Sequence, residues 1–531
     1  MREMTPHQRQ LVEALCDPAR YPHAARRVRL VETHISWVLL AGRYAYKIKK
    51  ALDLGFLDFT TLARRRFYCE EEIRLNRRLA PQLYLDVVAI GGSPQSPVLG
   101  EDDPAIEYAV RMRRFAASKQ MDRQLALALV TPTHIDRLAT LIARFHAGLP
   151  TAPQDSPFGT PREIQAPARQ NFDQLAPLLE PADLALLERL RAAIEGEYAA
   201  CAPWMERRRR EGWVRECHGD LHLGNIVLIR GQPTPFDGIE FNPALRWIDV
   251  MSEVAFLVMD LLDRSRPDLA FRFLNGYLEL TGDYAGVNLL RFYLAYRAMV
   301  RAKISAIFAR QRDTRPEPAG RAMAACHGYL ALASKCLAPQ RPALIITHGL
   351  PGSGKTTVAQ AALERLQAVR IRSDVERKRL FGLAPLERSR SGVGDGIYSA
   401  EGTQRTYARL HQLARDLLTA GFPVIVDAAF LRQAEREQFR QLACEMGLPF
   451  VMLNIRSAPA ILRQRILQRM TRAKDASEAD LQVLQVLQAA QEPLMPEELA
   501  CTVDFLDGDM TGNEASWSAL KKLTAPQDPS Q

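Results

Sequence analysis

The sequence predicts a multidomain protein in which an α+β region precedes an α/β region with a parallel sheet. The chain has 531 residues, more than one hydrophobic core accommodates at about 150 residues per domain. Residues 28–115 contain short strand patterns around one helical segment at 62–80, and residues 120–335 are mostly helical except around 214–240. After residue 341, apolar strands alternate with helical segments, as in parallel sheets; these strands are 343–348, 423–427, 449–455 and 503–506.

The clearest boundary is the segment LAPQRP, which places two prolines between the helical region and the first strand of the α/β region. We therefore predict four segments: 1–115, with strands and one helix; 116–336, mostly helical; 341–515, the α/β domain; and 516–531, a flexible tail.

Composition favours a soluble cytoplasmic protein. The chain is 47% hydrophobic and 25% charged, which is ordinary for globular proteins. No apolar run reaches the roughly 18 residues of a membrane span, and the amino terminus has no signal-peptide pattern. The eight cysteines form no CxxC pair, so we expect reduced thiols and neither disulfides nor structural zinc.

The net charge of +9 is spread along the chain, with +5 in residues 1–115 and +2 in residues 116–340. Nucleic-acid-binding proteins usually concentrate basic charge on one domain or stripe. Nucleic acid is therefore possible as a partner but not favoured. The run ERRRRE at 206–211 is expected to be a solvated helix end, with phosphate contact as the alternative.

The α/β region opens with ALIITHGLPGSGKTT, an apolar strand, a glycine-rich loop and a helix. The spacing fits the phosphate-binding pattern G-x-x-x-x-G-K-[ST] in its strand-to-helix context. Lys355 is expected to reach the β- and γ-phosphates, and the hydroxyl of Thr356 to bind Mg²⁺. The predicted nucleotide-binding residues here are Gly349, Leu350, Pro351, Gly352, Ser353, Gly354, Lys355, Thr356 and Thr357.

Three further residues follow strands of this region. Asp374, after VRIR, is positioned to accept a proton from an attacking hydroxyl, and Arg377 to hold the acceptor or the transferred phosphoryl group. Asp427 ends the strand VIVD and is a candidate for holding Mg²⁺. The alternatives are a helix-capping Asp374 with a surface Arg377, and a structural Asp427.

A run of cations without acids lies between residues 463 and 474, and it predicts a lid that closes over phosphates, with a solvated helix face as the alternative. Its first members are Arg463, Arg465 and Arg469, followed by Arg472 and Lys474. The glycine-rich insertion 382–402 is assigned to acceptor recognition.

On GLPGSGKTT, SDVER, VIVDAAF and the arginine run, residues 341–510 resemble P-loop kinases of small acceptors. This group includes polynucleotide 5′-kinases, zeta-toxin-like sugar-nucleotide kinases and chloramphenicol phosphotransferases. The resemblance implies a P-loop NTPase fold and phosphoryl transfer from ATP.

A second set of residues lies in CHGDLHLGNIVL and the later PFDGIEFN. Asp220 can orient and deprotonate an acceptor hydroxyl, while Asn225 and Asp237 can hold Mg²⁺ bridging nucleotide phosphates. His218 is interpreted as a scaffold residue. A coincidental loop, or a folded but inactive site, is the alternative.

These motifs resemble the aminoglycoside phosphotransferase and choline kinase branch of the protein-kinase-like fold, over residues 1–335. The resemblance implies a bilobal α+β domain with Asp220 as catalytic residue and Asn225 and Asp237 as metal ligands. It also implies a lysine that binds the α- and β-phosphates, Lys47 or less strongly Lys49, paired with Glu72, for which Glu70 and Glu71 compete. The hinge is expected at 107–112, and Asp249 is expected to brace the catalytic loop.

The sequence departs from the kinase pattern upstream of Lys47, where THISWVLLAGRY contains no G-x-G-x-x-G. The main expectation is a bifunctional enzyme that uses ATP and Mg²⁺. The amino-terminal region is expected to phosphorylate hydroxyl groups of small molecules, and the P-loop region those of a small-molecule, nucleotide or polynucleotide acceptor. One alternative is a single P-loop kinase with an inactive amino-terminal kinase-like binding module, and another is a nucleic-acid end-repair kinase. Aminoglycosides are disfavoured as acceptors because residues 116–340 are not acidic.

Overall fold

The computed structural model describes residues 6–55, 57–101, 104–311, 316–339, 342–389, 391–392, 394–472, 476–506 and 514–525. The chain divides into two compact units. The first consists of Met1–Gln174 and Ala202–Asp260, and the second of Leu175–Cys201 and Leu261–Gln531.

The first unit contains a six-stranded antiparallel sheet. The strand order is β1-β2-β3-β6-β4-β5, so β3 pairs with β6 in the middle of the sheet. The strands are β1 (Val28–Glu32), β2 (Ser36–Ala41), β3 (Tyr44–Lys49), β4 (Tyr84–Ser93), β5 (Ser96–Leu99) and β6 (Glu107–Arg113).

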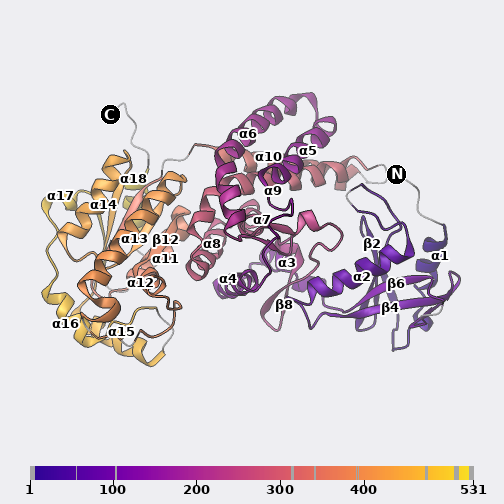
Figure 1. Ribbon diagram of the computed structural model, residues 1–531, viewed down its shortest axis with the longest axis horizontal. Helices are drawn as coiled ribbons and strands as arrows, with labels where there is room; N and C mark the ends of the chain where they lie inside the picture. Colours follow the sequence, from indigo (N-terminus) through magenta and orange to yellow (C-terminus); the bar gives the residue numbers. More distant parts are fainter. Residues whose placement is uncertain are drawn as a thin grey trace. The chain divides into compact units, whose positions relative to one another are not determined.

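Two helices pack on this sheet, and Figure 1 shows α2 (Leu62–Asn76) lying along β4 and β6. Side chains alternate between the faces of a strand. On β3, Tyr46 and Ile48 join a hydrophobic core that includes Leu11 and Val12 of α1 (Pro6–Ala14). Lys47 and Lys49 therefore point to the other face, where α2 lies.

The remainder of the first unit is mainly helical and carries two small antiparallel strand pairs. The strand pairs are β7 (Val214–Glu216) with β10 (Trp247–Asp249) and β8 (Ile226–Ile229) with β9 (Gln232–Pro235). The helices are α3 (Met121–Ala126), α4 (Pro132–Ala147), α5 (Pro161–Leu175), the carboxyl end of α6 (Pro181–Arg210) and most of α7 (Val250–Asp263).

The second unit is built around a five-stranded parallel sheet in the order β12-β13-β11-β14-β15. The strands are β11 (Leu344–His348), β12 (Val369–Arg372), β13 (Val424–Asp427), β14 (Phe450–Arg456) and β15 (Thr502–Leu506). Residues of β11 and β13 are fully buried, as expected where helices cover both faces of a parallel sheet.

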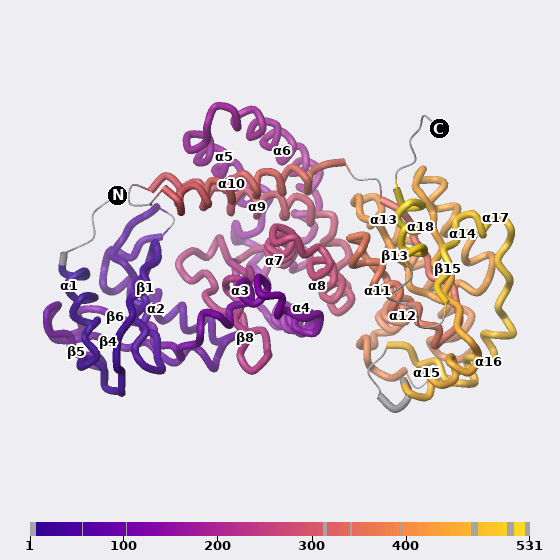
Figure 2. The backbone as a smooth tube through the Cα atoms, turned by 180° about the vertical axis from the view of Figure 1, so that it is seen from behind, coloured from indigo at the N-terminus to yellow at the C-terminus, as the bar shows by residue number. Residues whose placement is uncertain are grey.

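Helices precede and surround this sheet. Figure 2 shows α13 beside β13 and α18 beside β15, while α14 contacts β11 and β14. The helices before the sheet are α8 (Pro267–Thr281), α9 (Val287–Ala309) and α10 (Pro316–Leu337). Those after β11 are α11 (Lys355–Leu366), α12 (Ser373–Leu380), α13 (Ala400–Thr419), α14 (Gln433–Glu445), α15 (Pro459–Arg472), α16 (Leu481–Ala489), α17 (Pro496–Leu499) and α18 (Glu514–Thr524).

The predicted fold class is confirmed, an α+β region followed by a parallel α/β region. The hinge expectation at 107–112 is wrong, because those residues form β6 inside the sheet and the chain leaves the sheet only after Arg113. Among the helices of the described ranges, none combines the length and the apolar character that crossing a bilayer requires.

The arginine cluster at the end of α6 is not simply solvated. Arg208 is fully buried and its guanidinium bonds both carboxylate oxygens of Asp249, at 2.8 and 2.9 Å. Arg209 donates to backbone carbonyls of Gln154, Ser156 and Phe158. Arg208 and Arg209 therefore hold parts of the first unit together, whereas Arg207 and Arg210 are exposed.

Candidate active sites

The first site begins with a buried charge cluster between β3 and α2. The ammonium group of Lys47 lies 2.8 Å from Glu72 Oε1 and 2.6 Å from Asp237 Oδ1. Lys49 contacts the other oxygen of Glu72, at 2.7 Å, and also Glu240. Lys47 thus joins Glu72 to Asp237, whereas Lys49 is buried between Glu72 and Glu240.

The competing glutamates face elsewhere: Glu70 pairs with Arg66 and Glu71 with Arg74, both along α2. Burial alone would raise the pKa of Glu72, but the ammonium groups of Lys47 and Lys49 lower it to about 2. Glu72 is therefore a carboxylate at neutral pH.

The predicted catalytic residues of the first unit lie together in one loop. Asn225 Nδ2 donates to Asp220 Oδ2 over 2.8 Å, and His222 Nε2 lies 3.4 Å from the same oxygen. The backbone N–H of Phe236 donates to the carbonyl of Asn225 over 2.9 Å, which places Asp237 next to this loop. Asp237 has a left-handed backbone with φ of 63°, and its N–H donates to the hydroxyl of Tyr84 over 3.0 Å.

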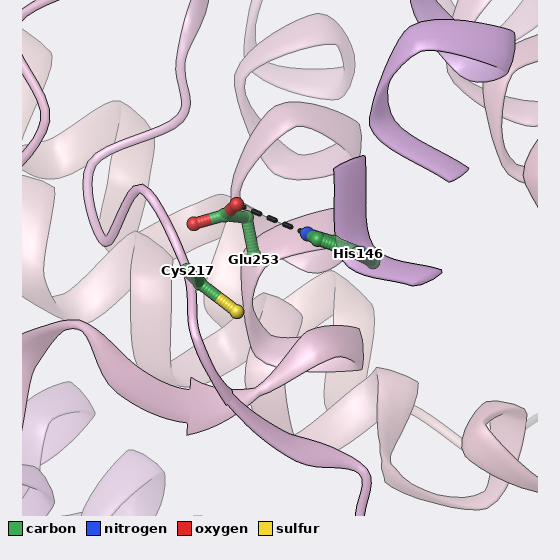
Figure 3. Close-up of side chains that lie close together, drawn as sticks. All are labelled: His146, Cys217 and Glu253. Atoms are coloured by element: carbon green, nitrogen blue, oxygen red, sulfur yellow. Dashed lines mark hydrogen bonds and ion pairs between the residues drawn. The ribbon is translucent and has the colours of Figure 1, made fainter. Parts of the chain in front are cut away.

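The loop that carries Asp220 is anchored by Glu253 of α7. Its Oε1 accepts from the N–H of His218 over 3.1 Å, and its Oε2 from the N–H of Gly219 over 2.6 Å. The ring of His146 adds a contact to Oε1 at 3.1 Å, drawn in Figure 3. The expectation that Asp249 braces this loop is corrected here, because Asp249 is engaged by Arg208 and by the N–H of Met251.

His146, Cys217 and Glu253 are close enough together to suggest a metal site (Figure 3), with ligand atoms within 4.8 Å of one another. The Sγ of Cys217 donates to the carbonyl oxygen of Ile248 over 3.7 Å, and burial raises the pKa of this thiol well above its ordinary value. Both oxygens of Glu253 already accept hydrogen bonds from the loop. The cluster is therefore explained as the loop anchor.

His218 has the scaffold environment that its sequence context suggested. Its Nε2 lies 2.9 Å from the carbonyl oxygen of Phe236, beside the strand that leads to Asp237. Burial lowers its pKa, so the ring is neutral at physiological pH. A neutral ring that bonds a carbonyl fixes the spacing between the two loops.

In the second unit, the glycine-rich loop joins β11 to α11 as predicted. Gly349, Gly352 and Gly354 all have positive φ, of 148°, 83° and 103°. A Cβ on Gly349 would collide with the carbonyl oxygen of Ile455. Gly349 and Gly352 therefore need glycine for both conformation and space, and Gly354 needs it for conformation. Lys355 Nζ donates to the carbonyl of Leu350 over 3.0 Å.

A cavity of about 1240 Å³ opens beside this loop. Residues from four predicted groups line it: the loop residues Lys355 and Thr356, the pair Asp374 and Arg377, Asp427, and Arg465. The second oxygen of Asp427 is buried and has no hydrogen-bond partner among the described residues. A carboxylate and a hydroxyl beside a phosphate loop are ligands that Mg²⁺ prefers, so the residues fit that ion.

Arg377 is partly occupied by the protein. Its guanidinium donates to the carbonyl of Ile397 over 2.8 Å and lies over the ring of Tyr398. It therefore holds Ile397 and Tyr398 of the insertion in place, and Ser391, Gly392 and Tyr398 line the wall of the cavity.

The arginine run is divided by its helix, α15. Arg465 donates to the carbonyls of Gly352 and Ser353, at 3.3 and 3.0 Å, so it contacts the phosphate loop. Arg463 is exposed and does not line the cavity. The side chains of Arg469 and Arg472, and all of Lys474, lie outside the described residues.

The cavity residues that sequence reasoning missed include Arg372, Tyr407 and Glu435. Glu435 lies in the first turn of α14 and hydrogen bonds Tyr407 of α13, and burial raises the pKa of its carboxyl group. The helix periodicity around Glu435 gives no sign of this contact. For Arg372, the only available signal was its position directly before Ser373 and Asp374 at a strand end.

Comparison with known families agrees with the two sites. The phosphotransferase enzyme family matches residues 67–290, and the family described as AAA domain matches residues 344–494. The chain thus contains one region that matches the phosphotransferase enzyme family and a later region that matches the AAA domain family.

Solved structures give weaker likenesses. The amicoumacin kinase hAmiN is 12% identical with a TM-score of 0.40, covering 62% of this chain and 94% of that chain. The APS kinase CysC of Mycobacterium tuberculosis is 20% identical with a TM-score of 0.26, covering 35% of this chain and 100% of that chain.

Full-length relatives share both regions. The uncharacterized protein Rv2004c of Mycobacterium tuberculosis is 31% identical over 464 residues, covering 87% of this chain and 89% of the relative. The uncharacterized protein Mb2027c of Mycobacterium bovis matches to the same extent. The chain therefore belongs to the family of these mycobacterial proteins, with a phosphotransferase enzyme region followed by a P-loop domain.

Proposed function

We propose that this protein is a bifunctional phosphotransferase that uses ATP and Mg²⁺ at two sites, each of which phosphorylates a hydroxyl group of a small molecule. The observation that supports the proposal is that the candidate phosphotransfer residues lie together in two separate groups. Lys47, Glu72 and Asp237 are joined in one unit. Lys355, Asp374 and Asp427 line one cavity in the other.

At the first site, Asp220 accepts the proton of the acceptor hydroxyl, and Asn225 holds its carboxylate in place. Lys47 binds the α- and β-phosphates, and Glu72 orients it. Asn225 and Asp237 hold Mg²⁺, which neutralises charge on the phosphates.

At the second site, the loop from Gly349 to Thr357 wraps the phosphates and Lys355 neutralises their charge. Thr356 and Asp427 hold Mg²⁺. Asp374 accepts the proton of the acceptor, while Arg465 approaches the loop from α15. Both sites act by positioning and charge stabilisation, without a covalent intermediate.

The cavity of the second unit favours a small polar acceptor. Its volume of about 1240 Å³ is enough for a nucleotide and a metabolite together. Its wall mixes Arg377 and Arg432 with Glu435 and Tyr407, so it offers hydrogen bonds of both polarities. A nucleic-acid strand is disfavoured by the small net charge of the region. We expect both reactions to take place in the cytoplasm, consistent with eight free cysteines.

The test is phosphoryl transfer from γ-labelled ATP to a panel of sugars, nucleosides, sugar nucleotides, aminoglycosides and 5′-hydroxyl oligonucleotides. Wild type, Lys355→Ala and Asp220→Ala are compared in the full chain. Two products, one lost in each variant, are the expected result.

Other results of this experiment would lead to a different function. If every product requires Lys355 and none requires Asp220, the first unit is a binding module rather than a second enzyme. Activity that survives both substitutions contradicts the proposal. Nucleotide titration of Lys355→Ala then shows whether the first unit still binds ATP.

A further inference from the structure

Helix α8 packs against the edge of the parallel sheet in the second unit and hydrogen bonds its edge strand. Strand β12 is an edge strand, and edge strands leave backbone groups unpaired. Here the side chain of Asn275 takes two of them. Its Nδ2 donates to the carbonyl of Ala368 over 2.9 Å, and its Oδ1 accepts from the N–H of Arg370 over 2.6 Å.

One turn further along α8, Glu279 contacts both arginines of β12. Glu279 Oε2 lies 3.1 Å from Arg370 Nη2, and Oε1 lies 2.6 Å from Arg372 Nη1. The side chains are largely enclosed, with exposed fractions of 19% for Glu279, 7% for Arg370 and 14% for Arg372. Two arginines so close together require a shared counter-charge, and Glu279 supplies it.

The two arginines lead to the two residues predicted to hold Mg²⁺. Arg370 Nη1 donates to the carbonyl of Thr356 over 3.3 Å, at the start of the phosphate-loop helix. Arg372 Nε lies 3.8 Å from the buried oxygen of Asp427. One carboxylate on α8 is therefore connected to both sides of the proposed metal site.

Helix α8 lies inside the region matched to the phosphotransferase enzyme family, whereas the contacts of Glu279 reach the P-loop site. Arg379 adds a hydrogen bond from its Nη2 to the backbone carbonyl of Glu279 over 2.6 Å. The P-loop site thus depends on residues that precede its own family region.

We propose that Glu279 is a positioning residue of the P-loop site, which sets the geometry of Thr356 and Asp427 through Arg370 and Arg372. This inference rests on the proposed phosphoryl transfer at that site. Without the charge of Glu279, Arg370 and Arg372 repel each other and Arg372 turns toward Asp427. The guanidinium of Arg372 then competes with Mg²⁺ for the carboxylate of Asp427.

The test uses Glu279→Gln in the full chain, with Arg272→Ala as the matched control. Arg272 also lies on α8 and makes an ion pair of 2.8 Å with Glu364 of α11, a contact to the same domain that does not involve β12. Thermal unfolding, product formation and binding of a fluorescent ATP analogue with Mg²⁺ or with EDTA are measured for each.

We expect Glu279→Gln to lower kcat of the Lys355-dependent product about 10-fold, because small displacements at a reacting centre cost that much or more. We also expect it to abolish most of the Mg²⁺-dependent increase in nucleotide affinity, with the affinity in EDTA unchanged. Arg272→Ala should change neither value. Wild-type kcat and Mg²⁺ dependence in Glu279→Gln, or equal losses in both variants, would overturn the inference.

Arg372→Lys is a second variant for the case in which Glu279→Gln unfolds. It keeps a cation beside Asp427 but removes the forked guanidinium that joins Glu279 to Asp427. The same loss of Mg²⁺ dependence is expected, and a wild-type profile contradicts the proposal. If Lys355→Ala keeps all products, the proposed function fails, whereas the Mg²⁺-dependent binding data still decide the role of Glu279.

Discussion

Glu253 Oε2 accepts a hydrogen bond from the backbone N–H of Gly219 over 2.6 Å, one residue before Asp220. The carboxylate is fully buried and also accepts from the N–H of His218. The carboxylate of Glu253 on α7 thus sets the position of Asp220, the proposed proton acceptor. Glu253 does this through the backbone of the two preceding residues and not through contact with the side chain of Asp220.

Glu253→Gln is expected to destabilise the first unit at pH 7 by about 3 kcal/mol, since the amide cannot accept both backbone bonds and its NH₂ faces a donor. The measurement is urea unfolding followed by tryptophan fluorescence. Four of the five tryptophans, Trp37, Trp204, Trp213 and Trp247, lie in that unit. Glu70→Gln, on the exposed side of α2, is the control and should have little effect.

The same pair of proteins has a predictable pH dependence. Burial raises the pKa of Glu253, but hydrogen bonds and the nearby imidazoles lower it to about 2 in the folded state. A depressed carboxylate pKa gives stability that is complete above the unfolded value and is lost as the pH falls through the range down to the folded value. The stability difference between wild type and Glu253→Gln should therefore shrink by about 1 kcal/mol between pH 6 and pH 3.5. A constant difference would show that the charge of Glu253 is not what anchors the loop.

Substitutions of Lys47 and Lys49 are expected to have different effects, the first mainly on nucleotide binding and the second mainly on the stability of the first unit. Lys47 reaches Asp237, whose side chain is 44% exposed, whereas Lys49 and both of its partners are enclosed. Lys47→Met should weaken nucleotide binding to the first unit at least about 10-fold, since a charged phosphate contact is lost. Lys49→Met should lower the unfolding temperature more than Lys47→Met does.

The comparison is made in a Lys355→Ala background, so that fluorescent-nucleotide titration reports only the first unit. Differential scanning fluorimetry gives the unfolding temperatures. Equal binding losses in both lysine variants would mean that Lys49 shares the phosphate role, the weaker assignment that the sequence left open.

Gly349→Ala tests whether the phosphate loop needs its glycine for space. The added Cβ meets the carbonyl oxygen of Ile455 and the φ of 148° is unfavourable for alanine. We expect nucleotide affinity of the second unit to fall at least about 10-fold, because the loop N–H groups move away from the phosphates. Gly328→Ala, in α10 with open space around its Cα, is the matched control and should bind nucleotide normally.

Much of this architecture could be predicted because it depends on local patterns. The strand, loop and helix around Lys355 and the spacing of Asp220 and Asn225 are contiguous in the chain, and both elements form as expected. Alternation on β3 also brings Lys47 to the face of α2, where Glu72 lies.

The remaining contacts depend on packing between distant segments, which periodicity does not encode. Asp249 was expected at the loop anchor, but that position is occupied by Glu253, four positions further along the chain in α7. Arg208 looked like part of a solvated run and is a buried partner of Asp249. Glu279 likewise had no signal, because its partners lie about ninety residues later.

The wall of the second cavity predicts an acceptor-binding role for Glu435. Its carboxylate hydrogen bonds Tyr407, lines the cavity and makes no contact with the phosphate loop in the described residues. Glu435→Gln should therefore raise the KM for the acceptor about 10-fold, the loss expected for one hydrogen bond to a charged group, while kcat and the KM for ATP stay within twofold.

Glu445→Gln is the control, since Glu445 lines the same cavity but is exposed and paired with Arg415. Because burial raises the pKa of Glu435, the wild-type carboxylate is protonated at a higher pH than an ordinary glutamate. As the pH is lowered, the wild-type acceptor KM should rise toward that of Glu435→Gln, whose KM should change less. Initial-rate kinetics of the Lys355-dependent product over that pH range provide the measurement, and parallel pH profiles for the two proteins would exclude Glu435 from acceptor binding.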